Sequence, residues 1–144
     1  MFSEVTKSIP SPGASSGVPA NPGPGDVKLW PSWPASSPWV TSVGATRFVG
    51  QKVGNAEMAT DQFGSGGGFS DMWTQSKDAK WQVNAVKHYT SNPPKDPHYP
   101  PASSFNPDGR ATPDVSALGE GYQVVANGGV VPVGGTSASA PAFA

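Results

Sequence analysis

The chain has 144 residues, which suits one domain at most. Its net charge of −1 gives no electrostatic basis for binding nucleic acid or an anionic membrane, and no apolar run approaches the roughly 20 residues that span a bilayer. Cysteine is absent, which excludes disulfides and cysteine-based metal sites.

Residues 1–29 are rich in proline, glycine, serine and alanine. Five prolines in this stretch oppose a helix or a central strand, so we predict a loop or a disordered arm. The first 20 residues have no basic start and no apolar core, so we do not expect them to form a signal peptide, and the compartment stays unknown. We expect the five tryptophans and six phenylalanines of the whole chain to prevent it from being wholly disordered.

The middle of the chain predicts a strand, a hairpin and a helix in turn. The apolar run Val40–Thr46 predicts a buried strand, and residues 47–70 predict a loop with a hairpin. Asp71–Thr90 predicts a helix, because apolar residues recur there at helical spacing until Ser91-Asn92-Pro93-Pro94 stops them.

The last quarter of the chain predicts a second pair of strands and a final helix. Tyr122–Ala126 and Val130–Val133 flank the turn signal Asn127-Gly128-Gly129. We expect these strands to join Val40–Thr46 in a partial α/β sheet, with the Asp71–Thr90 helix packed on it.

The segment from Gly134 to Pro141 is the most informative part of the chain. It places Ser137 after two glycines, which allow a tight turn and a close approach by a substrate. Unpaired N–H groups at a helix N-terminus could stabilise an oxyanion beside a nucleophilic serine. The alternative is a glycine loop that ends in an ordinary Ser or Thr cap.

Four motifs occur in the order known from the sedolisins, the serine-carboxyl peptidases that include tripeptidyl-peptidases. They are Trp33–Gly44 (W-P-A-S-S-P-W-V-T-S-V-G), Ser65–Ser70 (S-G-G-G-F-S), Gly109–Ala117 (G-R-A-T-P-D-V-S-A) and Gly135–Pro141 (G-T-S-A-S-A-P). The chain resembles this family from about residue 30 to residue 144. The resemblance implies a truncated peptidase domain at 30–144, a C-terminal portion with a partial subtilisin-like parallel sheet, flanking helices and many loops. It also implies peptide or protein substrates, hydrolysis through an acyl-enzyme on Ser137, and a secreted or lysosomal setting.

The family's other catalytic groups do not map onto this sequence. Its Glu-x-x-x-Asp pair has no counterpart, because Glu4 is followed four residues later by Ser8. Ser15 falls where the family has its oxyanion Asp, and the context of Asp26 does not match that role. The family's calcium ligands follow the nucleophile segment, so we expect no metal or cofactor site in this chain. His88 and His98 lie in contexts that favour surface residues over a catalytic base.

The remaining candidates have two interpretations each. Asp114, in the P-D-V-S-A motif, is expected to be a structural carboxylate that holds a loop. Gly66, Gly67 and Gly68 either let a backbone approach a bound peptide or form a mobile turn. The aromatic residues Trp33, Trp39 and Phe69 are expected in the core.

Two functions therefore remain open from the sequence. The first is a serine peptidase that lacks its acid pair and is inactive alone. The alternative is a non-catalytic pseudopeptidase or gene fragment with at most a peptide-binding role.

Overall fold

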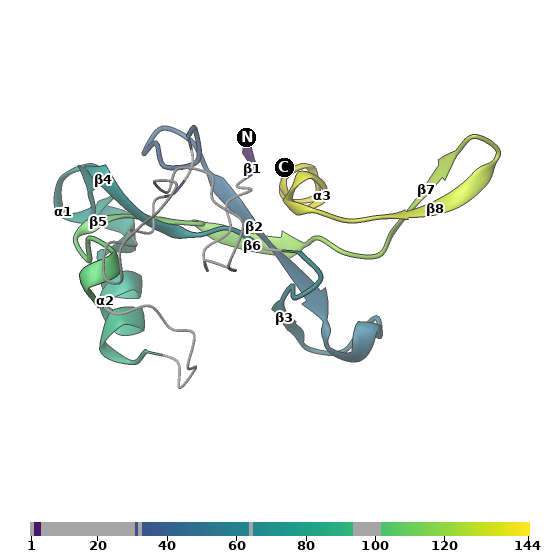
Figure 1. The fold of residues 1–144 in the computed structure, drawn as a ribbon, viewed down its shortest axis with the longest axis horizontal. Coiled ribbons are helices and arrows are strands. Elements are labelled where there is room, and N and C mark those ends of the chain that lie inside the picture. Colours follow the sequence, from purple (N-terminus) through teal and green to yellow (C-terminus); the bar gives the residue numbers. More distant parts are fainter. Residues whose placement is uncertain (1, 4–30, 32, 64, 94–101) are drawn as a thin grey trace, which may run out of the picture.

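The computed structural model describes residues 2–3, 31, 33–63, 65–93 and 102–144. The predicted N-terminal arm of residues 1–29 lies outside these residues, apart from Phe2–Ser3, which form the short strand β1. The described part is a loop-rich mixture of small sheets and short helices, which confirms the α/β class (Figure 1).

The central sheet is built around β2, Ser42–Phe48. This strand runs parallel to β1 and to β6 (Val115–Leu118), and antiparallel to β3 (Glu57–Ala59). The pairing with β3 is the hairpin expected within residues 47–70. The strand predicted at Val40–Thr46 is thus confirmed, although it begins two residues later. Its buried first half is made of small and β-branched residues, which fit between two covered faces.

A second sheet pairs β4 (Gly68–Thr74) with β5 (Gly109–Thr112) in antiparallel register. This sheet corrects the prediction of one helix over Asp71–Thr90. The first residues of that range belong to β4, and Thr74 pairs with Gly109.

The rest of the range is helical in three short pieces: α1 (Gln75–Asp78), the 3-10 helix η2 (Lys80–Gln82) and α2 (Val83–Ser91). The break falls at Ala79, whose backbone angles of φ −139° and ψ 53° are not helical. Pairing with β5 therefore overrides the helical spacing of the apolar residues.

The helix that covers the central sheet is α3, Thr136–Phe143, and not the predicted Asp71–Thr90 helix. It packs against β2 and β6, and Figure 1 shows it beside them, viewed nearly along its axis. Its buried side chains are Thr136, Ser139 and Ala140. These are small, so the helix lies close to the strands.

The strands β7 (Tyr122–Ala126) and β8 (Gly129–Val133) form a hairpin of their own. Both strands were predicted, but their placement in the central sheet is wrong: within the described residues they pair with each other alone. Figure 1 shows this hairpin extending away from the rest of the chain.

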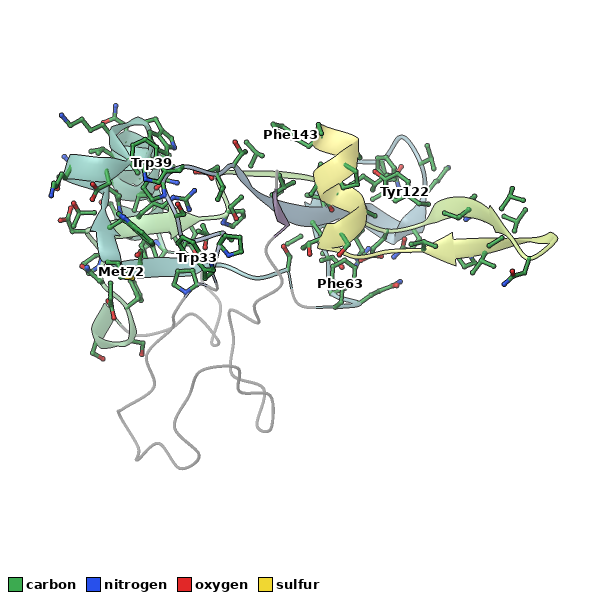
Figure 2. The ribbon with its side chains drawn as sticks, turned by 90° about the horizontal axis from the view of Figure 1, so that it is seen from above. Trp33, Trp39, Phe63, Met72, Tyr122 and Phe143 are labelled. Atoms are coloured by element: carbon green, nitrogen blue, oxygen red, sulfur yellow. The ribbon has the colours of Figure 1, made fainter. Side chains whose placement is uncertain are left out.

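Large aromatic side chains contribute little to the core. Trp33 is 70% exposed and Trp39 is 89% exposed, so their predicted core role is wrong (Figure 2). Trp33 instead stacks on Trp73, with ring centroids 5.8 Å apart, and Phe69 stacks on Phe105 at 4.7 Å. The apolar core consists of small residues: Ala35, Val43, Ala45, Ala79, Val86 and Ala140. None of the helices in the described ranges is long and apolar enough to cross a membrane.

Candidate functional site

Ser137 lies in the first turn of α3 and is exposed to solvent. Gly135 caps the helix with a φ of 131° and a ψ of 161°, a conformation that L side chains rarely adopt. Its carbonyl oxygen accepts the N–H groups of Ala138 at 2.9 Å and Ser139 at 3.2 Å, which closes the first turn. The glycine turn therefore places Ser137 at the surface, at a helix N-terminus, as the sequence predicted.

The first turn of α3 is held against the end of β6 by a backbone contact. The N–H of Gly135 donates to the carbonyl of Gly119 over 2.7 Å. Gly119 has no room for a side chain, because a Cβ there would lie 2.5 Å from Ser139 Oγ and 2.6 Å from Ala45 Cβ. Ser137 thus sits on a rigid, closely packed support.

The electrostatics at Ser137 favour an anion. The N–H groups of Thr136 and Ser137, at the start of α3, have no intrahelical acceptor, and the helix dipole adds partial positive charge there. None of the charged side chains in the described ranges lies in α3 or in the hairpin before it. This turn could therefore stabilise negative charge that develops next to Ser137 Oγ.

A general base for Ser137 is not found among the residues that the structure describes: none of their side chains hydrogen-bonds to its hydroxyl. His88 is exposed on α2, which lies well away from α3 in both views (Figures 1 and 2). Glu4, Ser15, Asp26 and His98 lie outside the described residues.

Glu120 is a buried carboxylate close to this support, and no motif in the sequence points to it. A Cβ on Gly134 would lie 3.7 Å from the Glu120 Cα and 3.7 Å from the Phe63 ring. Glu120 Oε2 accepts from Gln51 Nε2 at 2.7 Å, and Oε1 accepts from the Thr60 hydroxyl. Both carboxylate oxygens thus accept hydrogen bonds from residues on either side of β3, and neither of them is bonded to Ser137.

Asp114 accepts hydrogen bonds from several parts of the chain. Its Oδ2 takes the Ser42 N–H at 2.8 Å and Arg110 Nη2 at 2.6 Å. Its Oδ1 takes Gln82 Nε2 at 2.7 Å and the Trp81 indole N–H at 3.3 Å. We call these five residues the Asp114 node. The four donors come from β2, β5 and η2, which is the arrangement that a structural carboxylate requires.

The glycines Gly66, Gly67 and Gly68 connect the two sheets. Just before them, Ser65 Oγ accepts the N–H of Ala45 in β2 at 2.9 Å. Gly68 already belongs to β4 and pairs with Thr112. The triple glycine is therefore anchored at both ends, and neither a peptide contact nor a mobile turn follows from this geometry.

A metal centre is not apparent in the described part of the chain, where His, Asp and Glu nowhere gather in a group of three. The expectation about cofactors rests on the resemblance and stays a prediction.

Comparison with known proteins identifies the class to which this arrangement belongs. No family model matches the chain. Tripeptidyl-peptidase 1 of Bos taurus is 48% identical over 117 residues, which cover 78% of this chain and 19% of that protein. The Homo sapiens protein is 46% identical over 114 residues, with the same coverage. The Mus musculus protein is 45% identical over 123 residues, which cover 83% of this chain and 20% of that protein.

These similarities relate the chain to the serine peptidases. More narrowly, it is a homologue of tripeptidyl-peptidase 1, a sedolisin, and the family resemblance of its four motifs is confirmed. The chain spans about a fifth of the length of these relatives.

Proposed function

We propose that this chain carries the nucleophile of a sedolisin-type serine peptidase, and that Ser137 attacks the scissile carbonyl of a peptide. The observation that carries the proposal is the exposed Ser137 hydroxyl on the first turn of α3. The substrate class follows from the homology, and the names of the relatives favour release of tripeptides from a peptide.

In the proposed reaction, Ser137 Oγ adds to the carbonyl carbon while its proton passes to a base. The N–H of Ser137 donates to the oxyanion of the tetrahedral intermediate. Collapse expels the amine, which takes up the proton, and leaves an acyl-enzyme on Ser137. Water then hydrolyses this ester and restores the serine.

The base and the side-chain oxyanion donor are not supplied by any described residue. General-base assistance contributes about 10²–10⁴-fold, and one oxyanion donor contributes about 10²–10³-fold. We therefore expect the purified chain alone to be no faster than its Ser137→Ala variant.

The test supplies the missing base. The chain is mixed with a separately produced upstream segment of a tripeptidyl-peptidase 1 that bears the Glu/Asp helix. Release of a fluorophore from a tripeptide substrate is then followed at acidic pH. We expect turnover that Ser137→Ala abolishes. The matched control is Ser139→Ala, which removes a buried hydroxyl two residues further along the same helix and should leave turnover in place.

A non-catalytic role is the second candidate, and the observation that favours it is that none of the described side chains hydrogen-bonds to the Ser137 hydroxyl. It makes a different prediction in the same assay: the mixture would show no Ser137-dependent turnover, while fluorescence anisotropy would still detect binding of the labelled tripeptide. Turnover that persists in Ser137→Ala would overturn the nucleophile assignment.

A further inference from the structure

The β7–β8 hairpin presents an apolar surface that no other described element covers. Val125 is 79% exposed and Val130 is 62% exposed, and these two residues are cross-strand partners. The opposite face, with Val124, Val131 and Val133, is 40–47% exposed. Figure 1 shows the hairpin projecting away from the central sheet, and none of the other described strands pairs with either of its outer edges.

The hairpin is also uncharged. The last charged side chain before it is Glu120, and residues 121–144 contain no Asp, Glu, Lys, Arg or His. Exposed strands in natural proteins are usually protected from pairing by charges or by proline. Here the charges are missing.

The two edges differ in their protection. Asn127 and Gly128 form a two-residue turn, with φ of 50° and 79°, and Ala126 pairs with Gly129 across it. Hydrogen-bonded and non-hydrogen-bonded pairs alternate from this point, so Gln123–Pro132 and Val125–Val130 are non-hydrogen-bonded pairs. The backbone groups of these four residues therefore point to the outer edges.

Proline at position 132 removes one donor from the outer edge of β8. The outer edge of β7 keeps the N–H and C=O groups of both Gln123 and Val125. Thus β7 is an unprotected edge, and β8 is a blocked one.

We propose that β7 pairs with β7 of a second copy of this chain. In an antiparallel pair centred on Val124, Gln123 of one copy lies opposite Val125 of the other, and both residues exchange backbone hydrogen bonds. Val124 then faces its own counterpart across the two-fold axis. The result is a four-stranded sheet with the two Pro132-blocked edges outside.

A second copy fits this edge for two reasons. The uncharged strand β7 has no side chain that could pair with a charged partner, whereas β7 of a second copy is equally uncharged and matches it. A two-fold arrangement also pairs every outward donor and acceptor of Gln123 and Val125 with one in the other copy, and it extends the apolar valine surface on both faces.

The first test is the association state of the purified chain, measured by sedimentation velocity over a concentration series. We expect a reversible dimer. Gln123→Pro removes the outward N–H without touching a hydrogen bond inside the hairpin, and it should weaken the dimer by about tenfold or more. Val53→Lys is the control: Val53 is as exposed as Val125 but lies in the β2–β3 hairpin, so this change should leave the dimer intact.

The second test uses the absence of cysteine in the chain. A directly opposed, non-hydrogen-bonded pair has the Cβ separation that a disulfide needs. Val124→Cys should therefore form a covalent dimer on mild oxidation, at chain concentrations where Val131→Cys does not. Val131 is the cross-strand neighbour of Val124 on the same face and is similarly exposed.

A chain that stays monomeric throughout the series would overturn the proposal. So would a dimer that Gln123→Pro leaves unchanged, or equal cross-linking of the two cysteine variants, since either result would place the contact elsewhere.

Discussion

The Asp114 node and the β7–β8 hairpin differ in how their strands are held in place. The node joins β2, β5 and η2 through charged and polar side chains, and Arg110 at its centre is 0% exposed. Among the described strands, those of the hairpin pair only with each other, their one side-chain hydrogen bond to another described element runs from the Tyr122 hydroxyl to the Leu118 carbonyl, and the hairpin's valines face solvent. The first region is closed by contacts within the chain, whereas the second presents surface to a partner.

Because of this difference, we expect the node to contribute more than the hairpin to the free energy of unfolding. A buried ion pair contributes to stability when further hydrogen bonds satisfy its charges, and Asp114 has them. Arg110 donates to the carbonyls of Ala111 and Val40, while its Nε has no partner among the described residues. A two-stranded hairpin is marginal in water without a covering element. The candidate nucleophile Ser137 is linked to both regions, since α3 follows the hairpin directly in the chain but packs on the central sheet.

The largest effect should come from breaking the node. Arg110→Ala leaves the Asp114 carboxylate partly buried without its ion partner, and such changes cost about 3–5 kcal/mol. That is a large share of the stability of any domain of this size. We expect the cooperative part of a urea unfolding curve, followed by circular dichroism, to shift strongly or to disappear.

The control for this variant is Arg47→Ala. The Arg47–Asp61 pair has the same 2.6 Å separation as Arg110–Asp114, but its carboxylate side chain is 61% exposed, against 12% for Asp114. Equal losses in the two variants would contradict the assignment of stability to the node.

The sequence predicted the parts of the structure that depend on local signals. The Asn127-Gly128 turn and its flanking valines identified the hairpin, and the glycines before Ser137 identified the start of α3. The motif around Asp114 singled out a carboxylate, although nothing in the sequence named its four donors.

The sequence could not predict which elements meet. The spacing of Trp73 and Trp81 fits a helix, yet pairing with β5 makes Trp73 part of a strand, and Trp81 reaches Asp114 instead of the core. Hydrophobicity also misplaced Trp33 and Trp39, because the chain buries small residues and leaves these rings exposed. Glu120 had no local signal, since its partners Gln51 and Thr60 lie 60 or more residues away.

A moderate effect should come from the junction between the two regions. Gly119→Ala places a Cβ against Ser139 Oγ and Ala45 Cβ, both under 3 Å away, and overpacking of this kind costs about 1–3 kcal/mol. Because Gly119 also accepts the Gly135 N–H, the change should displace the turn before Ser137.

The matched control is Gly129→Ala in β8, where a Cβ meets nothing within 4 Å. Urea unfolding should separate the two variants by the overpacking cost. If Gly119→Ala is as stable as Gly129→Ala, the close contact between α3 and β6 is not a support for Ser137.

The smallest effect should come from the exposed ion pair, and it depends on pH. The hydrogen bond from Arg47 lowers the pKa of Asp61 below its ordinary value of 3.8 and raises the pKa of Arg47. A carboxyl group whose pKa is lower in the folded chain stabilises the fold above the unfolded pKa, and this contribution is lost as the pH falls through the folded pKa. This stabilising contribution is therefore lost below about pH 3.8, and solvent screening keeps it small.

Asp61→Asn should remove this contribution. The stability of the variant and that of the wild type, measured by urea unfolding, should therefore converge at acidic pH and differ slightly at neutral pH. The difference should shrink further at high salt. A large difference at neutral pH, comparable with that of Arg110→Ala, would mean that the surface pair and the buried pair stabilise the chain alike, and the contrast between closed and open regions would fail.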